Sequence, residues 1–281
     1  MSLFQVFVLA VIQGLTEFLP ISSSGHLILV PLLLGWPDQG LLMDVAVHVG
    51  TLGAVLVYFY RDVWSMIRGF VQLCGGKLTA GGKMALLLIV STLPAVAFGY
   101  WLSQSHLGEL RSMTLIAWTS IGYGLLLYAV DKLFPQAATI KDLNGLKALF
   151  IGFGQALALI PGTSRSGACM TFGRMLGLTR TEAARYAFLM SIPSIIAAAT
   201  LTGFKAVKAG TPLLSKPLLW GMGFAFLSGL AAIRFMMTWL RTSDFKPFMI
   251  YRVVLGGFLL FWAHKGPSSM QWIAQILASF R

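Results

Sequence analysis

The chain has 281 residues, of which 57% are hydrophobic and only 11% are charged. So few charged residues exclude a soluble domain of this size and indicate a protein that crosses a membrane several times. The net charge of +12 does not indicate nucleic-acid binding, because the basic residues are scattered over short loops and form no run interleaved with aromatic residues. We therefore predict one integral membrane domain over residues 1–281 and no nucleic-acid partner.

The first apolar segment, residues 1–19, contains no Lys or Arg. A signal peptide would carry a basic region there, so we expect this segment to belong to the fold. A short polar run separates it from residues 26–36, an apolar segment too short to cross ~30 Å of hydrocarbon at ~1.5 Å per residue. We predict that the two segments form a re-entrant hairpin with its turn at membrane depth.

Longer apolar segments, able or nearly able to cross the membrane, make up most of the remaining chain. They cover residues 41–60, 84–102, 113–130, 186–204, 217–233 and 247–263. Segments 146–160 and 168–178 flank a second polar run and repeat the hairpin pattern. The polar link 131–147 divides the chain into halves of about 1–140 and 141–281. We predict an all-α polytopic membrane protein with an inverted-topology repeat, in which each half has one re-entrant hairpin and three transmembrane helices.

The distribution of Lys and Arg predicts the orientation, because excess positive charge stays on the cytoplasmic side. With the N-terminus outside, thirteen of these residues lie in cytoplasmic loops and six in external segments. The cytoplasmic loops are then 61–83, 131–147, 174–185 and 234–246. The external residues are Arg111, Lys205, Lys208, Lys216, Lys265 and Arg281. We expect both termini to be external, and the charged residues of loop 174–185 to form a solvated fringe.

The two polar runs at the hairpin turns match each other at an offset of 142 residues. The first reads Gln-Gly-Leu-Thr-Glu-Phe-Leu-Pro-Ile-Ser-Ser-Ser-Gly-His at 13–26, and the second ends in Pro-Gly-Thr-Ser-Arg-Ser-Gly at 161–167. The matching positions include Gln13 and Gln155, Ser22 and Ser164, Ser24 and Ser166, and Gly25 and Gly167. The positions that differ are Glu17, Ser23 and His26 in the first run and Arg165 in the second. One run therefore carries an acid, a hydroxyl and an imidazole, and the other a guanidinium.

Irregular backbone at membrane depth is tolerated only where it is buried in protein or lines a wet cavity. Free amides beside serine hydroxyls at a helix start can form a cradle for an anion, and Arg165 adds a donor fork suited to phosphate oxygens. The candidate binding residues are Gln13, Ser22, Ser24, Gly25, Gly162, Thr163, Ser164, Ser166 and Gly167. The alternative for the serines and glycines is that they only permit tight turns and close helix packing.

Glu17 and His26 are the candidates for acid, metal and base chemistry. Glu17 follows Gln13 by four residues on one helix face, and such oxygen ligands suit Mg²⁺ or Ca²⁺. The alternative is a structural ion pair between Glu17 and Arg165. His26 lies three residues beyond Ser23, within reach for a base and a nucleophilic hydroxyl. Direct attack by His26, or by a water that it activates, remains open.

A further polar pair, Asp44 and His48, is spaced by four residues on one predicted crossing. We expect these two side chains to satisfy each other, with a place at the rim of the cavity as the alternative.

The two runs together resemble the motifs of the bacterial undecaprenyl-diphosphate phosphatases associated with bacitracin resistance, over essentially the whole chain. The resemblance implies a bacterial inner-membrane enzyme that hydrolyses undecaprenyl diphosphate to undecaprenyl phosphate and inorganic phosphate, with a divalent cation. Such an enzyme recycles the lipid carrier of peptidoglycan synthesis, and its partners are the polyprenyl diphosphate and membrane lipids; we also consider a homodimer. Carried over by motif, the catalytic residues are Glu17, Ser23, His26 and Arg165, with Glu17 also a metal ligand. Some members of the family have a glutamate where this chain has Gln13.

One alternative comes from a different class of protein. Inverted repeats whose broken helices meet at the midplane are also built into transporters, so a transporter of a lipid phosphate or small anion is the second hypothesis. The phosphatidic-acid-phosphatase pattern does not fit, because it requires a histidine and an aspartate where this chain has Thr171 and Met175.

Overall fold

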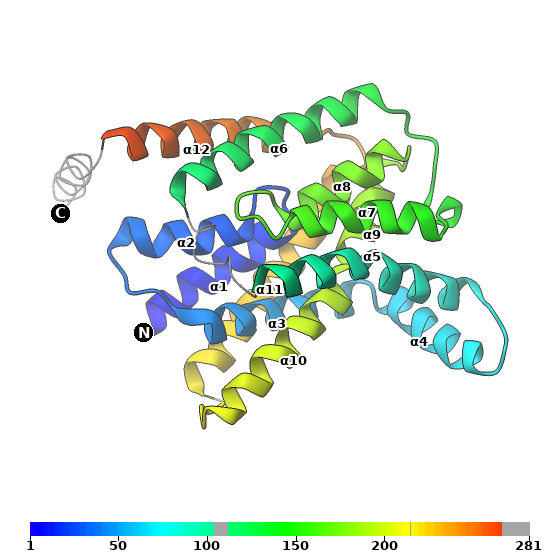
Figure 1. Ribbon diagram of the computed structural model, residues 1–281, viewed down its shortest axis with the longest axis horizontal. Helices are drawn as coiled ribbons and strands as arrows, with labels where there is room; N and C mark the ends of the chain where they lie inside the picture. Colours follow the sequence, from blue (N-terminus) through cyan, green and yellow to red (C-terminus); the bar gives the residue numbers. More distant parts are fainter. Residues whose placement is uncertain (104–111, 214, 266–281) are drawn as a thin grey trace.

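The computed structural model describes residues 1–103, 112–213 and 215–265, and these residues are almost entirely helical (Figure 1). The helices of the first half are α1 (Leu3–Phe18), α2 (Ser23–Leu34), α3 (Gly40–Tyr58), α4 (Tyr60–Cys74), α5 (Ala80–Ser103) and α6 (Met113–Leu133). A 3-10 helix, η1 (Ile140–Asp142), follows. The helices of the second half are α7 (Gly145–Leu157), α8 (Arg165–Met175), α9 (Arg180–Leu189), α10 (Ser191–Lys208), α11 (Lys216–Trp239) and α12 (Lys246–Lys265).

Six stretches of the described chain are long and apolar enough to cross a membrane, and each overlaps a predicted segment. They are Gly40–Tyr58, Ala80–Leu102, Met113–Leu133, Arg180–Lys208, Lys216–Trp239 and Lys246–His264. Large apolar side chains along them, such as Trp118, Leu227 and Val254, lie exposed on the outer surface. An apolar surface of this extent suits lipid rather than water. The prediction of a multi-pass, all-helical membrane protein is therefore confirmed.

The two polar runs form turns between paired short helices, α1 with α2 and α7 with α8. Among the described residues, Ser22 and Ser164 are the two non-glycine residues with a positive φ, and both have a φ of 73°. Each serine caps the helix that follows: Ser22 Oγ accepts from the Gly25 amide and Ser164 Oγ from the Gly167 amide. An L-residue in this region is strained, so the surrounding structure must hold both turns in place.

Each short hairpin packs on a long helix from the other half of the chain. Helix α1 lies along α11, and α7 lies along α5 (Figure 1). Glycines permit the close approach, because a Cβ on Gly14 would lie 1.9 Å from Ser228 Oγ of α11, and one on Gly152 would lie 2.3 Å from the Ser91 carbonyl oxygen of α5. Helices α6 and α12, which occupy equivalent places in the two halves, pack on each other. Because the short helices of each half pack on a long helix of the other half, the hairpins are an integral part of the helix bundle.

Residues 61–83 were predicted to form a loop, and this prediction is wrong for residues 61–74, which belong to helix α4 (Tyr60–Cys74). Its charged residues interrupt the hydrophobic run, so the segment does not read as a crossing. The helix is amphipathic instead: Met66 and Gly69 are buried, whereas Trp64 and Ile67 lie exposed on the opposite side. Helices of this kind lie in the membrane interface.

The predicted solvated fringe of loop 174–185 is also wrong, because Arg174 is fully buried. Its guanidinium donates to Asp131 Oδ1 (3.1 Å) and to the carbonyl oxygens of Asp131, Phe134, Pro135 and Leu178. Arg180 donates to both carboxylate oxygens of Asp131 at 2.7–3.0 Å. The network ties the link between the halves to α8 and α9. The C-terminus and the counted charges of Arg111 and Arg281 lie outside the described residues.

Asp131→Ala should destabilise the protein by about 3–5 kcal/mol, because it leaves the buried Arg174 without its carboxylate partner. Thermal unfolding in detergent measures the effect. Asp244→Ala is the matched control, since its ion pair with Lys132 (2.7 Å) is solvent-exposed and its loss should destabilise the protein much less. Equal losses in both variants would contradict the structural role of Asp131.

Candidate active site

The structure brings the two polar runs into direct contact. Arg165 of α8 forms a close ion pair with Glu17 Oε1 of α1. Ser166 Oγ donates to the Leu19 carbonyl oxygen at 3.1 Å, which joins the second turn to the first. A Cβ on Gly167 would lie 3.2 Å from the Pro20 side chain, which is a tight contact, so glycine favours this close approach. The Glu17–Arg165 ion pair, which the sequence analysis gave as the alternative to a metal role for Glu17, is therefore present.

Glu17 is the centre of the contact. Its side chain is only 3% exposed, and its second oxygen, Oε2, accepts from Ser23 Oγ (2.6 Å) and from Gln13 Nε2 (3.0 Å). His48 Nε2 lies 3.6 Å from the same oxygen. A carboxylate buried this deeply requires such partners, because an unpaired buried charge is very unfavourable.

Ser23 and His26 are not paired as predicted, because the Ser23 hydroxyl donates to Glu17. His26 Nδ1 lies 2.7 Å from the Ser22 carbonyl oxygen, so this nitrogen carries a proton and donates to it. His26 Nε2 lies 2.5 Å from Tyr251 Oη on α12, and the two rings stack at 13°. The reason is local. The His26 side chain binds the carbonyl oxygen of Ser22, four residues earlier, whereas Ser23, the first residue of α2, faces α1.

The remaining predicted binding residues line the two turns. Gln13 and Thr163 are completely buried, and Gln13 Oε1 and Thr163 Oγ1 have no hydrogen-bond partner among the described residues. The hydroxyls of Ser22 and Ser24 lie 3.4 Å apart, and those of Ser164 and Ser166 lie 3.3 Å apart. Gly25 and Gly167 use their amides to complete the helix caps, which supports a turn-forming role for these two glycines. The amides of Ser23 and Ser24 in α2 and of Arg165 and Ser166 in α8 are not part of these caps, and free amides at a helix start can bind an anion.

Arg252 on α12 is the principal residue that the sequence analysis missed. It is fully buried, and its guanidinium donates only to backbone carbonyl oxygens, at 2.8–3.2 Å. The acceptors are Pro20 in the first turn, Gly162 and Thr163 in the second turn, and Thr119 and Ser120 in α6. One side chain therefore fixes both turns and the helix beside them. The sequence did contain a sign of this role, because an arginine within a membrane span is energetically unfavourable unless it has hydrogen-bond or ionic partners.

Arg252 also changes the charge of the site. Glu17 and Arg165 neutralise each other, and no carboxylate of the described residues contacts Arg252. Arginine stays protonated in proteins, so one positive charge remains uncompensated behind the turns. A positive charge in surroundings of low dielectric attracts an anion strongly.

Comparison with known proteins places the chain in a family. The family model described as bacitracin resistance protein BacA matches residues 6–258. The chain belongs to the BacA family. The matched range includes both polar runs as well as His48, Tyr251 and Arg252.

Curated relatives of this BacA-family chain match it almost from end to end. It is 46% identical over 275 residues to an undecaprenyl-diphosphatase 1 of Rhodospirillum rubrum, covering 95% of this chain and 97% of the relative. It is also 47% identical over 262 residues to proteins called undecaprenyl-diphosphatase in Jannaschia sp. and in Ruegeria pomeroyi, covering 92% of this chain and 98% of each relative.

The donors that this BacA-family site offers to a metal ion are mainly oxygens. No group of three or more His, Cys, Asp or Glu side chains with metal-binding geometry occurs in the described part of the chain. Beside the single carboxylate of Glu17 lie the unpartnered amide oxygen of Gln13 and the hydroxyl of Ser23. Carboxylate, amide and hydroxyl oxygens fit a hard divalent cation whose other ligands come from a phosphate or from water.

Arg252→Met should lower the stability of the protein by about 2–4 kcal/mol, because carbonyl oxygens of both turns lose their donors in a dry environment. Thermal unfolding in detergent measures the loss. Arg234→Met on α11 is the matched control, since Arg234 lies exposed and its removal should change stability by less than about 0.5 kcal/mol. An unchanged unfolding temperature in Arg252→Met would contradict the assigned role.

Proposed function

We propose that this BacA-family protein is an undecaprenyl-diphosphatase of the bacterial inner membrane. It hydrolyses undecaprenyl diphosphate to undecaprenyl phosphate and inorganic phosphate, which recycles the lipid carrier of peptidoglycan synthesis and confers bacitracin resistance. The names of relatives that are 46% and 47% identical support the activity. The structural observation that carries the proposal is the chain Ser23–Glu17–Arg165, which places a hydroxyl, a proton acceptor and a phosphate-binding guanidinium together between two helix starts.

The membrane topology we infer is an inverted repeat with both hairpins re-entrant and both termini external. The reciprocal packing of α1 on α11 and of α7 on α5 supports this arrangement, as do the equal φ angles of Ser22 and Ser164. The loops after α4 and after α6 lie at the end of the molecule opposite the N-terminus (Figure 1). They belong to the basic loops, and excess basic residues stay in the cytoplasm. The turns then meet within the membrane, where the polyprenyl tail can remain among lipids.

Substrate binding begins with an exchange of partners at Arg165. In the structure this guanidinium is paired with Glu17, and a diphosphate offers it oxygens of matching geometry. Arg252 adds positive charge behind the turns, and the first-turn amides of α2 and α8 add donors. The exchange releases Glu17 from its cation. Oε1 of Glu17 is then free for another ligand, while Oε2 keeps the hydrogen bond from Ser23.

Ser23 is the nucleophile in this scheme, and Glu17 replaces His26 as its base. The Ser23 hydroxyl already donates to Glu17 Oε2 at 2.6 Å. Ser23 Oγ transfers its proton to Glu17 and forms a bond to the terminal phosphorus, while the bond from that phosphorus to the bridging oxygen breaks and undecaprenyl phosphate leaves. Water then attacks the phosphoserine, Glu17 returns its proton to the departing Ser23 Oγ, and inorganic phosphate is released. His26 Nε2 accepts the proton of this water once Tyr251 Oη gives up its hydrogen bond to that nitrogen.

A divalent cation, Mg²⁺ or Ca²⁺, fits the same site. Glu17 and the unpartnered Gln13 Oε1 would hold it, with phosphate oxygens as further ligands. When bound, the cation supplies positive charge that stabilises the negative charge on the transferring phosphoryl group. Because Gln13 is neutral, this site has one carboxylate fewer than the family members with two acids.

Phosphate release from undecaprenyl diphosphate by the detergent-solubilised protein tests the activity and separates it from transport. An enzyme needs no sealed compartment, whereas a lipid-phosphate or anion transporter acts only across vesicles. Arg165→Lys keeps the charge but loses the bidentate fork, so release should fall by about 10²-fold or more while the protein still folds. No release by the wild type, or full release by Arg165→Lys, would contradict the proposal.

Substitutions at the three reacting side chains distinguish their roles. Ser23→Ala and Glu17→Gln should reduce phosphate release to a similar low level, because nucleophile and base act as one unit. His26→Ala should lose about 10²–10⁴-fold, the usual contribution of a general base, and keep a residual rate. Tyr251→Phe should lose less than His26→Ala. An active Ser23→Ala with an inactive His26→Ala would identify the histidine, or a water that it activates, as the nucleophile.

Chelation should abolish phosphate release, and added Mg²⁺ or Ca²⁺ should restore it. Glu17→Gln should raise the dissociation constant for the cation in a direct binding measurement, because a hard cation loses its charged ligand. Gln13→Glu should bind the cation more tightly than the wild type. Full activity in excess chelator would remove the metal from this scheme.

A further inference from the structure

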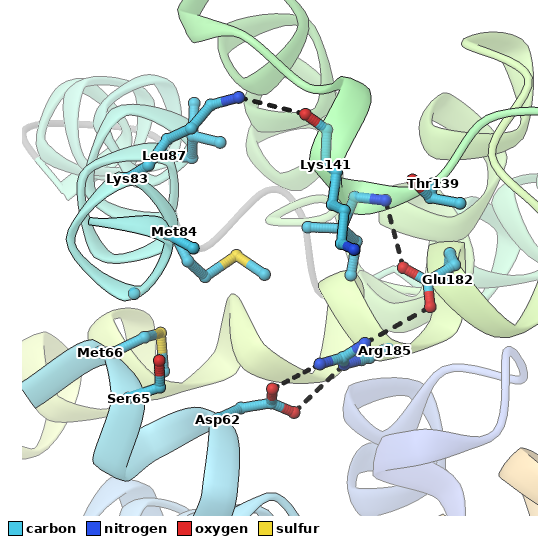
Figure 2. Close-up of a pocket in the computed structure, with 13 residues that line it drawn as sticks. Asp62, Ser65, Met66, Lys83, Met84, Leu87, Thr139, Lys141, Glu182 and Arg185 are labelled. Atoms are coloured by element: carbon cyan, nitrogen blue, oxygen red, sulfur yellow. Dashed lines mark hydrogen bonds and ion pairs between the residues drawn. The ribbon is translucent and has the colours of Figure 1, made fainter. Parts of the chain in front are cut away.

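A cavity lies outside the two turns (Figure 2). Helices α4 and α5, which line it, meet at the end of the molecule opposite the N-terminus (Figure 1). Its volume is about 530 Å³, and it is lined by residues of α4, α5, η1 and α9. None of the residues that line it belongs to the site between the turns. The volume is within the ~300–1,000 Å³ range of small-molecule sites in proteins.

The cavity is amphipathic. Its walls include the buried apolar side chains of Met66, Leu87 and Ile140, with Met84 beside them. Charged groups surround these walls (Figure 2). They are Asp62, Lys83, Lys141, Glu182 and Arg185.

The acidic groups of the cavity are already engaged by a single arginine. Arg185 pairs with both Asp62 and Glu182, and Glu182 also accepts from the Ile140 amide at 3.1 Å. Figure 2 shows this row of interactions crossing from α4 to η1. The row has two carboxylates and one guanidinium, and the positive charges of Lys83 and Lys141 outweigh the negative charge that remains.

The two lysines are in a different position. Lys83 Nζ donates to the Lys141 carbonyl oxygen at 3.1 Å, and no carboxylate of the described residues forms an ion pair with either ammonium group. The nearby carboxylate of Asp142 accepts from the amide and hydroxyl of Thr139, and it attracts Lys83 and Lys147 electrostatically without forming a direct ion pair with Lys83. Two ammonium groups beside an apolar wall therefore remain available for an anion.

Helix α4 indicates where this cavity lies relative to the membrane. Its exposed apolar side chains include Trp64, Ile67 and Val71, and the Arg68 guanidinium lies over the Trp64 ring, 4.8 Å from its centroid. Amphipathic helices with tryptophan and basic residues lie at the level of lipid headgroups. Because α4 forms one wall, the cavity is at the same level.

We propose that this cavity is a binding site for an anionic phospholipid. The lipid phosphate lies between Lys83 and Lys141, and the upper part of an acyl chain lies against Met66 and Met84. Basic pockets between membrane helices on the cytoplasmic side are known to bind such headgroups. A bound lipid would join α4 and α5 to η1 and α9, in addition to the Arg185 row. The site is independent of the hydrolysis proposed above.

Binding of three probes to the full-length protein in detergent tests the proposal. The probes are phosphatidylglycerol, phosphatidylcholine with the same acyl chains, and inorganic phosphate, each measured by native mass spectrometry and by the rise in unfolding temperature. Phosphatidylglycerol should bind best. Combining Lys83→Gln with Lys141→Gln should weaken phosphatidylglycerol binding roughly thirtyfold. Each lysine near an anionic lipid contributes about 1 kcal/mol, and the loss of two such contributions corresponds to this factor in Kd.

The matched control combines Lys205→Gln with Lys208→Gln, a lysine pair on α10 that does not line the cavity. This control should bind phosphatidylglycerol as the wild type does. Unchanged unfolding temperatures without lipid, and unchanged phosphate release, show that both double variants are folded. Equal binding by the wild type and the cavity variant, or an equal loss in the control, would overturn the proposal. Binding of inorganic phosphate as tight as that of the lipid would overturn the lipid as the occupant.

Discussion

A charge buried among apolar helices must be paired or completely hydrogen bonded, and this requirement organises the centre of the molecule. Glu17 meets it with Arg165 and Ser23, and Arg252 meets it with backbone carbonyl oxygens from three segments. Three of the carbonyls that Arg252 binds, those of Pro20, Gly162 and Thr163, belong to the irregular turns. The strained backbone at Ser22 and Ser164 is thereby held in place, and with it the alignment of the reacting side chains.

The same requirement explains why binding can drive chemistry. The resting site is neutral at Glu17 and Arg165 and positive at Arg252, so a diphosphate brings the negative charge that the site lacks. Its arrival redistributes the partners of Arg165, and the carboxylate left behind is the one that already holds the Ser23 proton. A transporter would use the same electrostatic attraction but would need no nucleophilic hydroxyl. Ser23 therefore distinguishes the two functions.

The sequence predicted those features that follow from local pattern. Six apolar segments predicted the six spans, and the two matched runs identified the turns that follow Glu17 and precede Arg165. Contacts across the bundle could not be predicted in this way. Whether Ser23 faces Glu17 depends on the rotation of α2 against α1, and Tyr251 and Arg252 reach the turns because α12 packs on α6. Helix α4 was missed because its alternating charged and apolar residues resemble a loop when only continuous hydrophobicity is considered.

The central claim is that Ser23, with Glu17 as its base, becomes phosphorylated during turnover. Rapid acid quenching with undecaprenyl diphosphate radiolabelled in its terminal phosphate, followed by proteolysis and mass spectrometry, tests it directly. The label should be found on Ser23, should accumulate in His26→Ala because the second step is slowed, and should be absent from Ser23→Ala. Label on His26, or full turnover by a Ser23→Ala variant that carries no label, would contradict the account.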